Sequence, residues 1–518
     1  MCLALLCAVA LAVALGSCGG GGGSESPLDD ALGYLPADAP LVLTLRTDLE
    51  SRPYRDLNVA VQRFGVQGGI DSQLEQLSPG EGLSFSRDIK PLLGNELAIG
   101  VLPGAADAGP RFIAAVRSAD GGKLRQLLHS VSGLQEKKSV HGAAVYGPPA
   151  PRGSAGDYGS DGSGNPWFAV NGDTLVAAES ERGLADALDQ HGADDHLGEQ
   201  LFNQRLRGLP AEGILRASGD LVSAMKALGA QDTADVPWMR ALRSYGASLS
   251  VSGRTLMADT VVNTDSVREQ DLPIPSGTAS PGLVPRRLSL ATRDQSQTMK
   301  FGIALAQASV PQATFADIER VIKKRAGAPL ATLLDEFGEG LTAKLPNGDL
   351  VTRSEVHDEK VVARGLRALS PDEPLIARLA TSGGPVGEVL SRARFLIPAL
   401  PAPASGFFPE GSKVRSVAGS PDLYQLTPPF QERNAPFVFG LLDGVFVTAP
   451  SLADARQAAR LKPAKPDAQQ GAIALSLPIR PSDVGVSQDI GGGITLTTLR
   501  GGVEAAAQSL RLQVRAAL

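Results

Sequence analysis

Cysteine is scarce in this sequence, and its placement restricts the chemistry that the chain can carry. The 518 residues contain three cysteines, Cys2, Cys7 and Cys18, and none follows. A disulfide framework, a thiolate metal site and a cysteine nucleophile are therefore excluded from the body of the protein. A thiol confined to the first eighteen residues needs another explanation.

Aromatic residues and positive charge are also sparse. Phe, Trp and Tyr make up 4% of the chain, so its cores must be built mainly from Leu, Val, Ile and Ala. The formal net charge is −6 at pH 7. Nucleic-acid-binding proteins carry clustered Lys and Arg, so the composition predicts no nucleic-acid partner and no polybasic membrane patch.

Recognisable catalytic and cofactor motifs are absent from the sequence. It has no G-x-S-x-G elbow, no phosphate-binding G-x-x-x-x-G-K-[ST] and no H-E-x-x-H. His191 and His196 lie five residues apart, off helical register, and "DYGSDGSGNP" from Asp157 lacks the residues of a calcium loop. We therefore predict a protein that is not an enzyme, with no catalytic residue, cofactor or metal site.

Long hydrophobic runs are missing too, and the longest near the start is short. Leu3 to Leu15 is apolar and uncharged, whereas a membrane-spanning helix needs about 20 residues. The run suits the hydrophobic region of a secretory signal, so residues 1–17 are predicted to be a signal peptide. An ordinary secretory signal and an uncleaved anchor are the alternatives.

Leu15-Gly16-Ser17-Cys18 has the pattern of a bacterial lipobox, in which the cysteine thiol receives a diacylglycerol group. We predict that Cys18 is the site of lipid attachment and that residues 18–27 are a Gly/Ser tether. No Lys or Arg precedes Cys18, so either the start codon is placed too late or the terminal amine alone serves. The expected location is the outer face of the cytoplasmic membrane, reached by secretion and held by the anchor.

The chain contains an internal repeat. The segment from Val145 and the segment from Leu423 both show an apolar residue and Tyr, then Pro-Pro, an irregular loop, an aromatic strand, a two-residue turn and a helix-like run. The turns are predicted at Asn171-Gly172 and Asp443-Gly444. Upstream, "GGKLRQLL" from Gly121 resembles "GGPVGEVL" from Gly383, and "LGNELAIGV" resembles "FGEGLTAKL".

These matches predict two homologous halves, residues 28–270 and 286–518, joined by a Pro/Gly linker at 271–285. The expected fold class is α+β, with each half an antiparallel sheet that has helices packed on one face. Strands that end in Ser, Thr or Asp recur within each half and predict helix caps. "GITLTTLRGG" and "VEAAAQSLRLQV" are expected to form a closing hairpin that corresponds to "ASLSVSG" and "TLMADTVVN".

One exposed apolar contact is also a candidate. Phe407 and Phe408 are adjacent in a proline-rich stretch of an aromatic-poor chain. They either fold back over the core or form an apolar lip for a partner, a lipid or a membrane surface.

Three segments resemble a family of uncharacterised extracytoplasmic proteins from high-GC Gram-positive bacteria, often lipid- or membrane-anchored. They are "YLPADAPLVLTLRTD" from Tyr34, "RDIKPLLGNELAIGV" from Arg87, and the Asp-Gly hairpin followed by a helix. The resemblance implies a domain of unknown function outside the cytoplasm and brings no catalytic residues.

The function expected from these features is a non-enzymatic binding or scaffolding role in the cell envelope. Its partners would be the membrane, through the lipid anchor, and an envelope protein or lipid not identified by the sequence. The alternative is a lipid or glycolipid carrier, which would need an apolar cavity of several hundred Å³. An envelope hydrolase is the third hypothesis, and it would need two buried carboxylates in one cleft with raised pKa values.

Overall fold

The computed structural model describes most of the chain after its first 25 residues. The described residues are 26–63, 75, 84–104, 109–131, 133–149, 166–227, 236–308, 316, 319–320, 322–324, 326–368, 413–427, 437–465, 471–478 and 498–517. Cys18, Phe407 and Phe408 lie outside these residues, as does the predicted signal peptide.

Strands dominate the architecture. The first ten are β1 Leu41–Leu45, β2 Leu97–Leu102, β3 Arg111–Arg117, β4 Gln135–Glu136, β5 Ala144–Gly147, β6 Trp167–Asn171, β7 Thr174–Ala178, β8 Leu215–Asp220, β9 Leu242–Ser252 and β10 Thr255–Thr264. The next ten are β11 Ser289–Thr292, β12 Phe337–Lys344, β13 Leu350–Val356, β14 Lys413–Val417, β15 Ser420–Thr427, β16 Phe437–Leu442, β17 Val445–Ala449, β18 Ile473–Pro478, β19 Thr498–Ala506 and β20 Ser509–Ala517.

Helices occupy the connections between these strands. The α-helices are α2 Pro27–Leu32, α3 Arg52–Arg63, α5 Gly121–Ser130, α6 Glu181–His191, α7 Glu199–Arg205, α8 Leu221–Ala227, α9 Pro237–Ala241, α10 Gln295–Ala308, α12 Leu330–Leu334, α13 Glu359–Ala368 and α16 Leu452–Ala459. Three short turns of other helix types are η1 Phe85–Ile89, η2 Lys90–Leu92 and η4 Glu269–Asp271. Within the described residues, no helix combines the length and hydropathy needed to cross a membrane.

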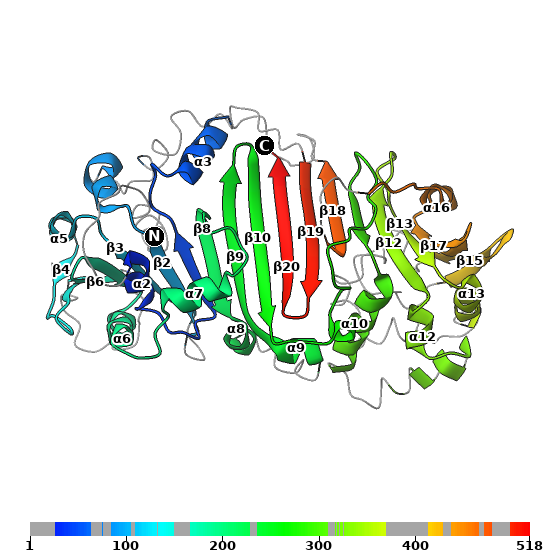
Figure 1. Ribbon diagram of the computed structural model, residues 1–518, viewed down its shortest axis with the longest axis horizontal. Coiled ribbons are helices and arrows are strands. Elements are labelled where there is room, and N and C mark those ends of the chain that lie inside the picture. The colour runs from blue at the N-terminus through cyan, green and yellow to red at the C-terminus, as the bar shows by residue number, and fades with distance from the viewer. Residues whose placement is uncertain are drawn as a thin grey trace.

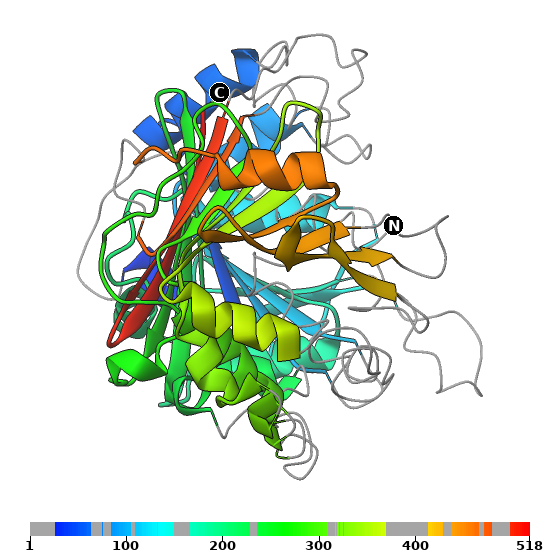
Figure 2. The same ribbon diagram turned by 90° about the vertical axis from the view of Figure 1, so that its right-hand side faces the viewer.

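All twenty described strands join one antiparallel sheet. Their hydrogen-bonded order is β4-β5-β6-β7-β3-β2-β1-β8-β9-β10-β20-β19-β18-β11-β12-β13-β17-β16-β15-β14. The molecule is elongated, with β10 and β20 side by side at its middle (Figure 1). Figure 2 shows β15 and β17, which lie near the β14 end of the sheet, crossing the direction of β20, as the twist of a wide sheet requires.

The pairing order of β1–β10 recurs in β11–β20, with each strand number raised by ten. The two sets meet along β10 and β20, where Ala258 lies opposite Val514 and Asp259 opposite Gln513. The sequence predicted a separate sheet for each half. The pairing of β10 with β20 instead makes one continuous sheet, because each strand would otherwise expose an unpaired edge.

Helices cover both faces of the first part of this sheet, so the prediction of helices on one face is wrong there. One face packs against α2, α6 and α7 through residues such as Leu32, Leu184 and Phe202. The other packs against α5 through Leu124 and Leu128. The reason lies in the strands: all five residues of β7 are buried, so neither face can be left to solvent.

Three helices begin at the side-chain caps that the sequence predicts. Asp120 accepts a hydrogen bond from the backbone N–H of Lys123 at the start of α5. Asp220 does the same for Ser223 in α8, and Asp294 for Gln297 in α10. Ser180 and Ser451, which the sequence analysis did not single out, cap α6 and α16 in the same way. α13 follows β13 in the chain, in the same way that α5 follows β3. The predicted counterpart of α5 at residues 383–390 lies outside the described residues.

Two predicted hairpins are confirmed, but their turns differ in detail. Asp443 and Gly444 both have positive φ, 52° and 82°, as a type I′ turn requires. Asn171 instead pairs with Thr174, so the turn residues between β6 and β7 are Gly172 and Asp173, one position later than predicted. The register of the whole β-ladder, rather than the Asn-Gly signal, decides this turn.

The closing hairpin is confirmed as β19 and β20, matching β9 and β10 of the first ten strands. Its turn lies at Ala507-Gln508, inside the segment predicted as the second strand. Gly501 and Gly502, at the end of the first predicted strand, are buried residues inside β19. The Cβ of a larger residue at Gly501 would lie 3.2 Å from the backbone oxygen of Gln513, so neighbouring strands explain this glycine.

The segment predicted as a linker packs against the sheet. Leu272 and Ile274 are buried in a cluster with Ala472 and Ala505. Further along, Leu283 forms an isolated bridge with Ala464. The proposed domain boundaries stay predictions, and residues 271–285 lie against elements of the second half.

Candidate functional site

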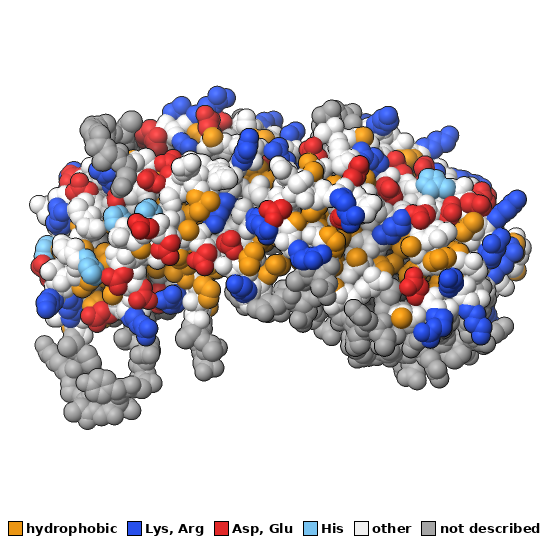
Figure 3. Space-filling view, turned by 60° about the horizontal axis from the view of Figure 1, so that its bottom comes forward, with side chains coloured by type: hydrophobic (Ala, Val, Ile, Leu, Met, Phe, Trp, Pro, Cys, Tyr) orange, Lys and Arg blue, Asp and Glu red, His pale blue; other side chains and the backbone are white. Residues whose placement is uncertain are grey.

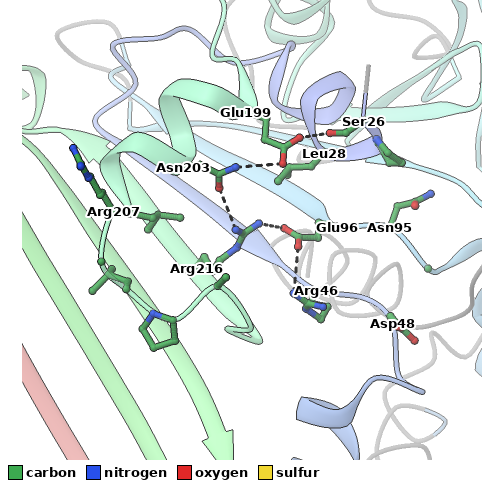
Figure 4. A pocket seen from close by; sticks show the side chains of 17 residues that line it. Ser26, Leu28, Arg46, Asp48, Asn95, Glu96, Glu199, Asn203, Arg207 and Arg216 are labelled. Atoms are coloured by element: carbon green, nitrogen blue, oxygen red, sulfur yellow. Dashed lines mark hydrogen bonds and ion pairs between the residues drawn. The ribbon is translucent and has the colours of Figure 1, made fainter. Parts of the chain in front are cut away.

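A polar pocket of about 640 Å³ opens where β1, β2 and β8 meet α2 and α7 (Figure 4). Its walls come from the start of α2, the end of β1, the residues before β2, α7 with the loop that follows, and β8. The lining residues are Ser26, Pro27, Leu28, Arg46, Asp48, Gly94, Asn95, Glu96, Glu199, Asn203, Leu206, Arg207, Gly208, Leu209, Pro210, Ala211 and Arg216.

Three charged side chains form the centre of this pocket, which we call the charged trio: Arg46, Glu96 and Arg216. Arg216 is buried and forms an ion pair with Glu96. The Nη2 atom of Arg46 lies 3.9 Å from the Oε1 atom of Glu96. Figure 4 shows Glu96 between the two guanidinium groups. Two arginines thus share one carboxylate, which leaves the trio with one positive charge.

Strand register brings the trio together. Leu45 of β1 pairs with Leu97 of β2 on one side and with Leu215 of β8 on the other. Arg46 follows Leu45, Glu96 precedes Leu97 and Arg216 follows Leu215. Because side chains alternate along a strand, all three lie on the same face, away from these leucines.

The trio continues into a hydrogen-bonded chain that reaches the start of α2. Arg216 donates to the Oδ1 atom of Asn203 at 3.4 Å, and Asn203 donates to the Oε1 atom of Glu199 at 3.3 Å. The hydroxyl of Ser26 donates to Glu199. The Arg216 guanidinium also lies over the ring of Phe202, 5.2 Å from its centroid. Arg216 is therefore held from several sides.

Arg46 is held less completely than Arg216. Its Nε atom is buried and has no hydrogen-bond partner among the described residues. Its backbone is held firmly, since its N–H donates to the carbonyl of Ile214 and its own carbonyl accepts from the hydroxyl of Tyr54 at 2.6 Å. Burial raises the pKa of Tyr54 well above its usual range, which keeps this hydroxyl a donor. Arg46 thus has a fixed backbone and a partly exposed side chain in the pocket lining, and only its buried Nε is left without a partner among the described residues.

The second half provides an internal comparison for these positions. Ala291 of β11 pairs with Leu341 of β12 and with Ala474 of β18, as Leu45 pairs with Leu97 and Leu215. The positions equivalent to the charged trio are Thr292, Gly340 and Leu475.

None of these three residues is charged, and the space at Gly340 is filled. A Cβ on Gly340 would overlap the amide of Gln295, whose side chain is buried. The second half therefore builds the same strand arrangement with an uncharged trio.

The two histidines considered in the sequence analysis have protein partners. The Nε2 atom of His191 lies 3.1 Å from the Oδ1 atom of Asp30, and its ring stacks on Tyr34. The Nδ1 atom of His196 lies 2.6 Å from the carbonyl oxygen of Ala193. Within the described residues, no cluster of three or more His, Cys, Asp or Glu side chains is arranged to hold a metal ion.

One carboxylate bears on the hydrolase hypothesis. Burial, and to a lesser extent the charge of Glu355, raises the pKa of Glu339, while a hydrogen bond from the Gly282 N–H opposes the shift. Glu355 itself is exposed. The pair therefore lacks the second buried carboxylate that the hypothesis requires.

Sequence reasoning missed the charged trio. Arg46 and Arg216 stand in "LVLTLRTD" and "GILRASGD", segments interpreted as strands ending in helix caps, and Glu96 stands in a segment used to detect the repeat. An arginine directly after one apolar strand, Arg46, and another inside a second strand, Arg216, were a detectable signal. Their meeting was not, because it depends on a three-strand register.

Comparisons with known proteins give a family but no activity. The family described as "Protein of unknown function (DUF3352)" matches residues 1–280, a span that ends inside the segment predicted as a linker. No curated protein matches the chain.

Solved structures of a protein named TP0453 show a weak likeness. Crystal form III is 8% identical, with a TM-score of 0.25, and the match covers 46% of this chain and 81% of that one. Crystal form I is 10% identical, with a TM-score of 0.25 and coverage of 47% and 81%. Likenesses of this size support no argument about fold or function.

Proposed function

We propose that this chain, which belongs to the DUF3352 family of proteins of unknown function, is a membrane-anchored, extracytoplasmic binding protein with no catalytic role. Its ligand site would be the pocket around the charged trio. The lining favours a polar or charged ligand, since six of its side chains carry charge: Arg46, Asp48, Glu96, Glu199, Arg207 and Arg216.

The observation that carries this proposal is the difference between the two halves. Bringing Arg216 and Glu96 out of water has a desolvation cost that their attraction often fails to offset. The second half builds the same strand arrangement with Gly340 and Leu475 instead. The fold therefore does not need the charges, and ligand recognition explains why one half carries them.

We further propose that the halves arose by duplication of one ten-strand unit. The recurring strand order and the aligned registers support this interpretation. One copy would then have kept or acquired the pocket while the other became a structural partner across β10 and β20.

The pocket can be tested by fractionating an extract of the producing cell envelope and measuring thermal unfolding of the purified protein with each fraction. A ligand that binds only the folded state raises the unfolding temperature. We expect Arg46→Met to abolish the rise that wild type shows.

Thr292→Val is the matched control, because it changes the equivalent position of the second half and removes a buried hydroxyl that has no partner among the described residues. It should respond like wild type. An equal response of Arg46→Met and wild type to every active fraction would refute the assignment of the site.

The anchor is a separate part of the proposal, and it has its own test. Metabolic labelling with a clickable fatty acid should mark wild type and leave Cys18→Ala unlabelled. Absence of label from wild type would refute the lipid anchor. The assignment of the pocket would still be tested by the thermal-unfolding experiment.

The alternative of an apolar lipid carrier is less well supported. It requires a cavity lined by aliphatic groups, whereas charged and amide side chains form much of this pocket's lining.

A further inference from the structure

The pocket lies where the predicted tether enters the folded body. Ser26 and Pro27 line it, and Pro27 is the first residue of α2. Ser26 caps this helix by accepting from the Asp29 N–H at 3.0 Å, and its hydroxyl also donates to Glu199 in the pocket wall. The attachment point of the tether and the pocket rim are thus the same residues.

The length of the tether sets how far this rim can stand from the membrane. Cys18 and Ser26 are eight residues apart, and five of the seven between them are glycine. A glycine-rich chain of eight steps spans about 16 Å on average and about 28 Å at full extension. An acylated Cys18 would therefore hold the pocket close to the lipid head groups.

The chemistry of the pocket suits a phosphate group. Arginine presents a planar set of N–H donors that matches phosphate oxygens. The charged trio has one positive charge in excess, and the Arg46 side chain in the pocket lining is 27% exposed, compared with 10% for Arg216. Figure 4 shows Arg207 directed away from the trio, so Arg46 and Arg216 are the cations at the centre.

The charges around the trio restrict the ligand further. The lining also contains the carboxylates of Glu199 and Asp48 and the guanidinium group of Arg207. With these included, the positive and negative charges of the lining are equal in number. A zwitterionic head group, with a phosphate and an ammonium group, satisfies this balance better than a multiply anionic one. On the face shown in Figure 3, acidic and basic side chains are interspersed, so that face lacks the broad basic surface of a protein attracted to anionic bilayers.

We propose that the pocket binds the phosphate-bearing head group of a lipid from the membrane that holds the anchor. This inference rests on the proposed function and names its ligand class. Arg46 contacts the phosphate, Arg216 positions Glu96 and Asn203, and Glu199 faces the cationic end of the head group. Anchor and pocket then engage the same membrane surface.

The test uses the full-length protein, processed and purified from its membrane and reconstituted at equal density into two kinds of vesicle. One kind is made of phosphatidylethanolamine and phosphatidylcholine, and the other of a galactolipid with the same acyl chains and no phosphate. We expect the unfolding temperature to be about 2–4 °C higher in the phospholipid vesicles.

Variants connect this shift to the pocket. Arg46→Met should remove the difference between the two vesicles, and Arg46→Lys should keep part of it, because the charge stays while the planar donor set is lost. Thr292→Val should keep all of it. If Arg46→Met does not fold, the Lys variant alone decides, since a full-sized shift in it would contradict a role for the guanidinium.

A third arm separates lipid from soluble phosphate. If 1 mM inorganic phosphate in galactolipid vesicles reproduces the whole shift, the ligand is a soluble phosphate compound and the lipid inference is wrong, although the proposed function stands. Equal unfolding temperatures in all vesicles, with or without phosphate, also overturn this inference. The proposed function itself fails if the envelope fractions are also inactive, or if Arg46→Met and wild type respond equally to every active fraction.

Discussion

At the scale of single residues, the pocket depends on an arrangement that is costly for the fold. Arg216 is buried and its ion pair with Glu96 is largely shielded from water. Removing one member of such a pair leaves an uncompensated charge, whereas replacing both can be close to neutral. The second half, with Gly340 and Leu475 in these places, illustrates the neutral solution.

Replacing Arg216 alone should therefore be damaging. We expect Arg216→Leu to lower the free energy of unfolding by about 3 kcal/mol, and Glu96→Gln added to it to recover most of that loss. Urea denaturation measures both changes. The matched control is Arg243→Leu, which removes an exposed ion pair with Asp265 and should cost less than about 1 kcal/mol. Equal losses for the two leucine variants would contradict this account.

Asp259 is a second residue whose charge the fold does not need. Burial raises its pKa above the ordinary value of 3.8, although Arg515 and Gln513 oppose the shift. A carboxyl group with a raised folded pKa destabilises the folded state once it ionises. The cost is absent below its ordinary pKa and grows as the pH rises through the folded pKa.

Asp259→Asn removes this charge without changing the shape of the side chain. We expect the variant to be more stable than wild type at pH 7 and to lose that advantage as the pH falls toward about 3.5. Denaturant titrations at both pH values measure the difference. A stability gain that stays the same at both would show that ionisation is not the cause.

At the scale of elements, corresponding helices of the two halves begin in the same way. Ser180 caps α6 after β7, and Ser451 caps α16 after β17. Each serine hydroxyl accepts a hydrogen bond of 3.1 Å from a backbone N–H group at the helix start. That N–H group would otherwise have no partner within the helix. The two helices then pack on their sheets through buried residues such as Leu184 and Ala455.

Removing either cap should destabilise the protein. Ser180→Ala and Ser451→Ala are each expected to lower the free energy of unfolding by at least about 1 kcal/mol, because one N–H at each helix start loses its acceptor. Ser451→Ala should cost the more of the two, since the Ser451 hydroxyl also donates to the buried carboxylate of Asp454. Chemical denaturation gives both values, with the exposed Ser252→Ala as a control expected to be neutral. A loss confined to one half would argue against equivalent roles.

At the scale of the whole molecule, one strand pair unites the two halves. β10 and β20 pair over nine residues, from Thr255 opposite Ala517 to Asn263 opposite Ser509. The sheet is continuous across this junction, so neither half ends in a free edge there. We expect wild type to unfold in a single transition, with circular dichroism and tryptophan fluorescence coincident.

A proline in β20 should break this coupling. Leu512 lies in the middle of β20, and Leu512→Pro removes a backbone donor from a central strand, which costs about 3 kcal/mol or more. We expect the transition to separate into two, detected as different midpoints by the two probes. Leu512→Thr keeps the N–H and should preserve a single transition. Coincident probes in the proline variant would mean that other contacts couple the halves.

Much of the local structure was predictable from the sequence, because short-range physics determines it. The caps at Asp120, Asp220 and Asp294 and the turn at Asp443-Gly444 involve groups a few residues apart. Membership of a family of unknown function was indicated by local motifs as well. The turn at Gly172-Asp173 lies one position after the Asn-Gly signal, and the turn at Ala507-Gln508 lies inside the second predicted strand, since the ladder register of whole strands decides both.

The sequence by itself indicated many of the strands and several helix starts, because these depend on side-chain chemistry and spacing within one segment. The tertiary structure alone decided that β10 pairs with β20 and that Arg46, Glu96 and Arg216 meet. Arg46 and Arg216 are 170 positions apart, and their approach depends on β1 lying between β2 and β8 in a single register. That register is set by the simultaneous burial of many side chains from separate strands. It therefore cannot be predicted from any single segment of the sequence.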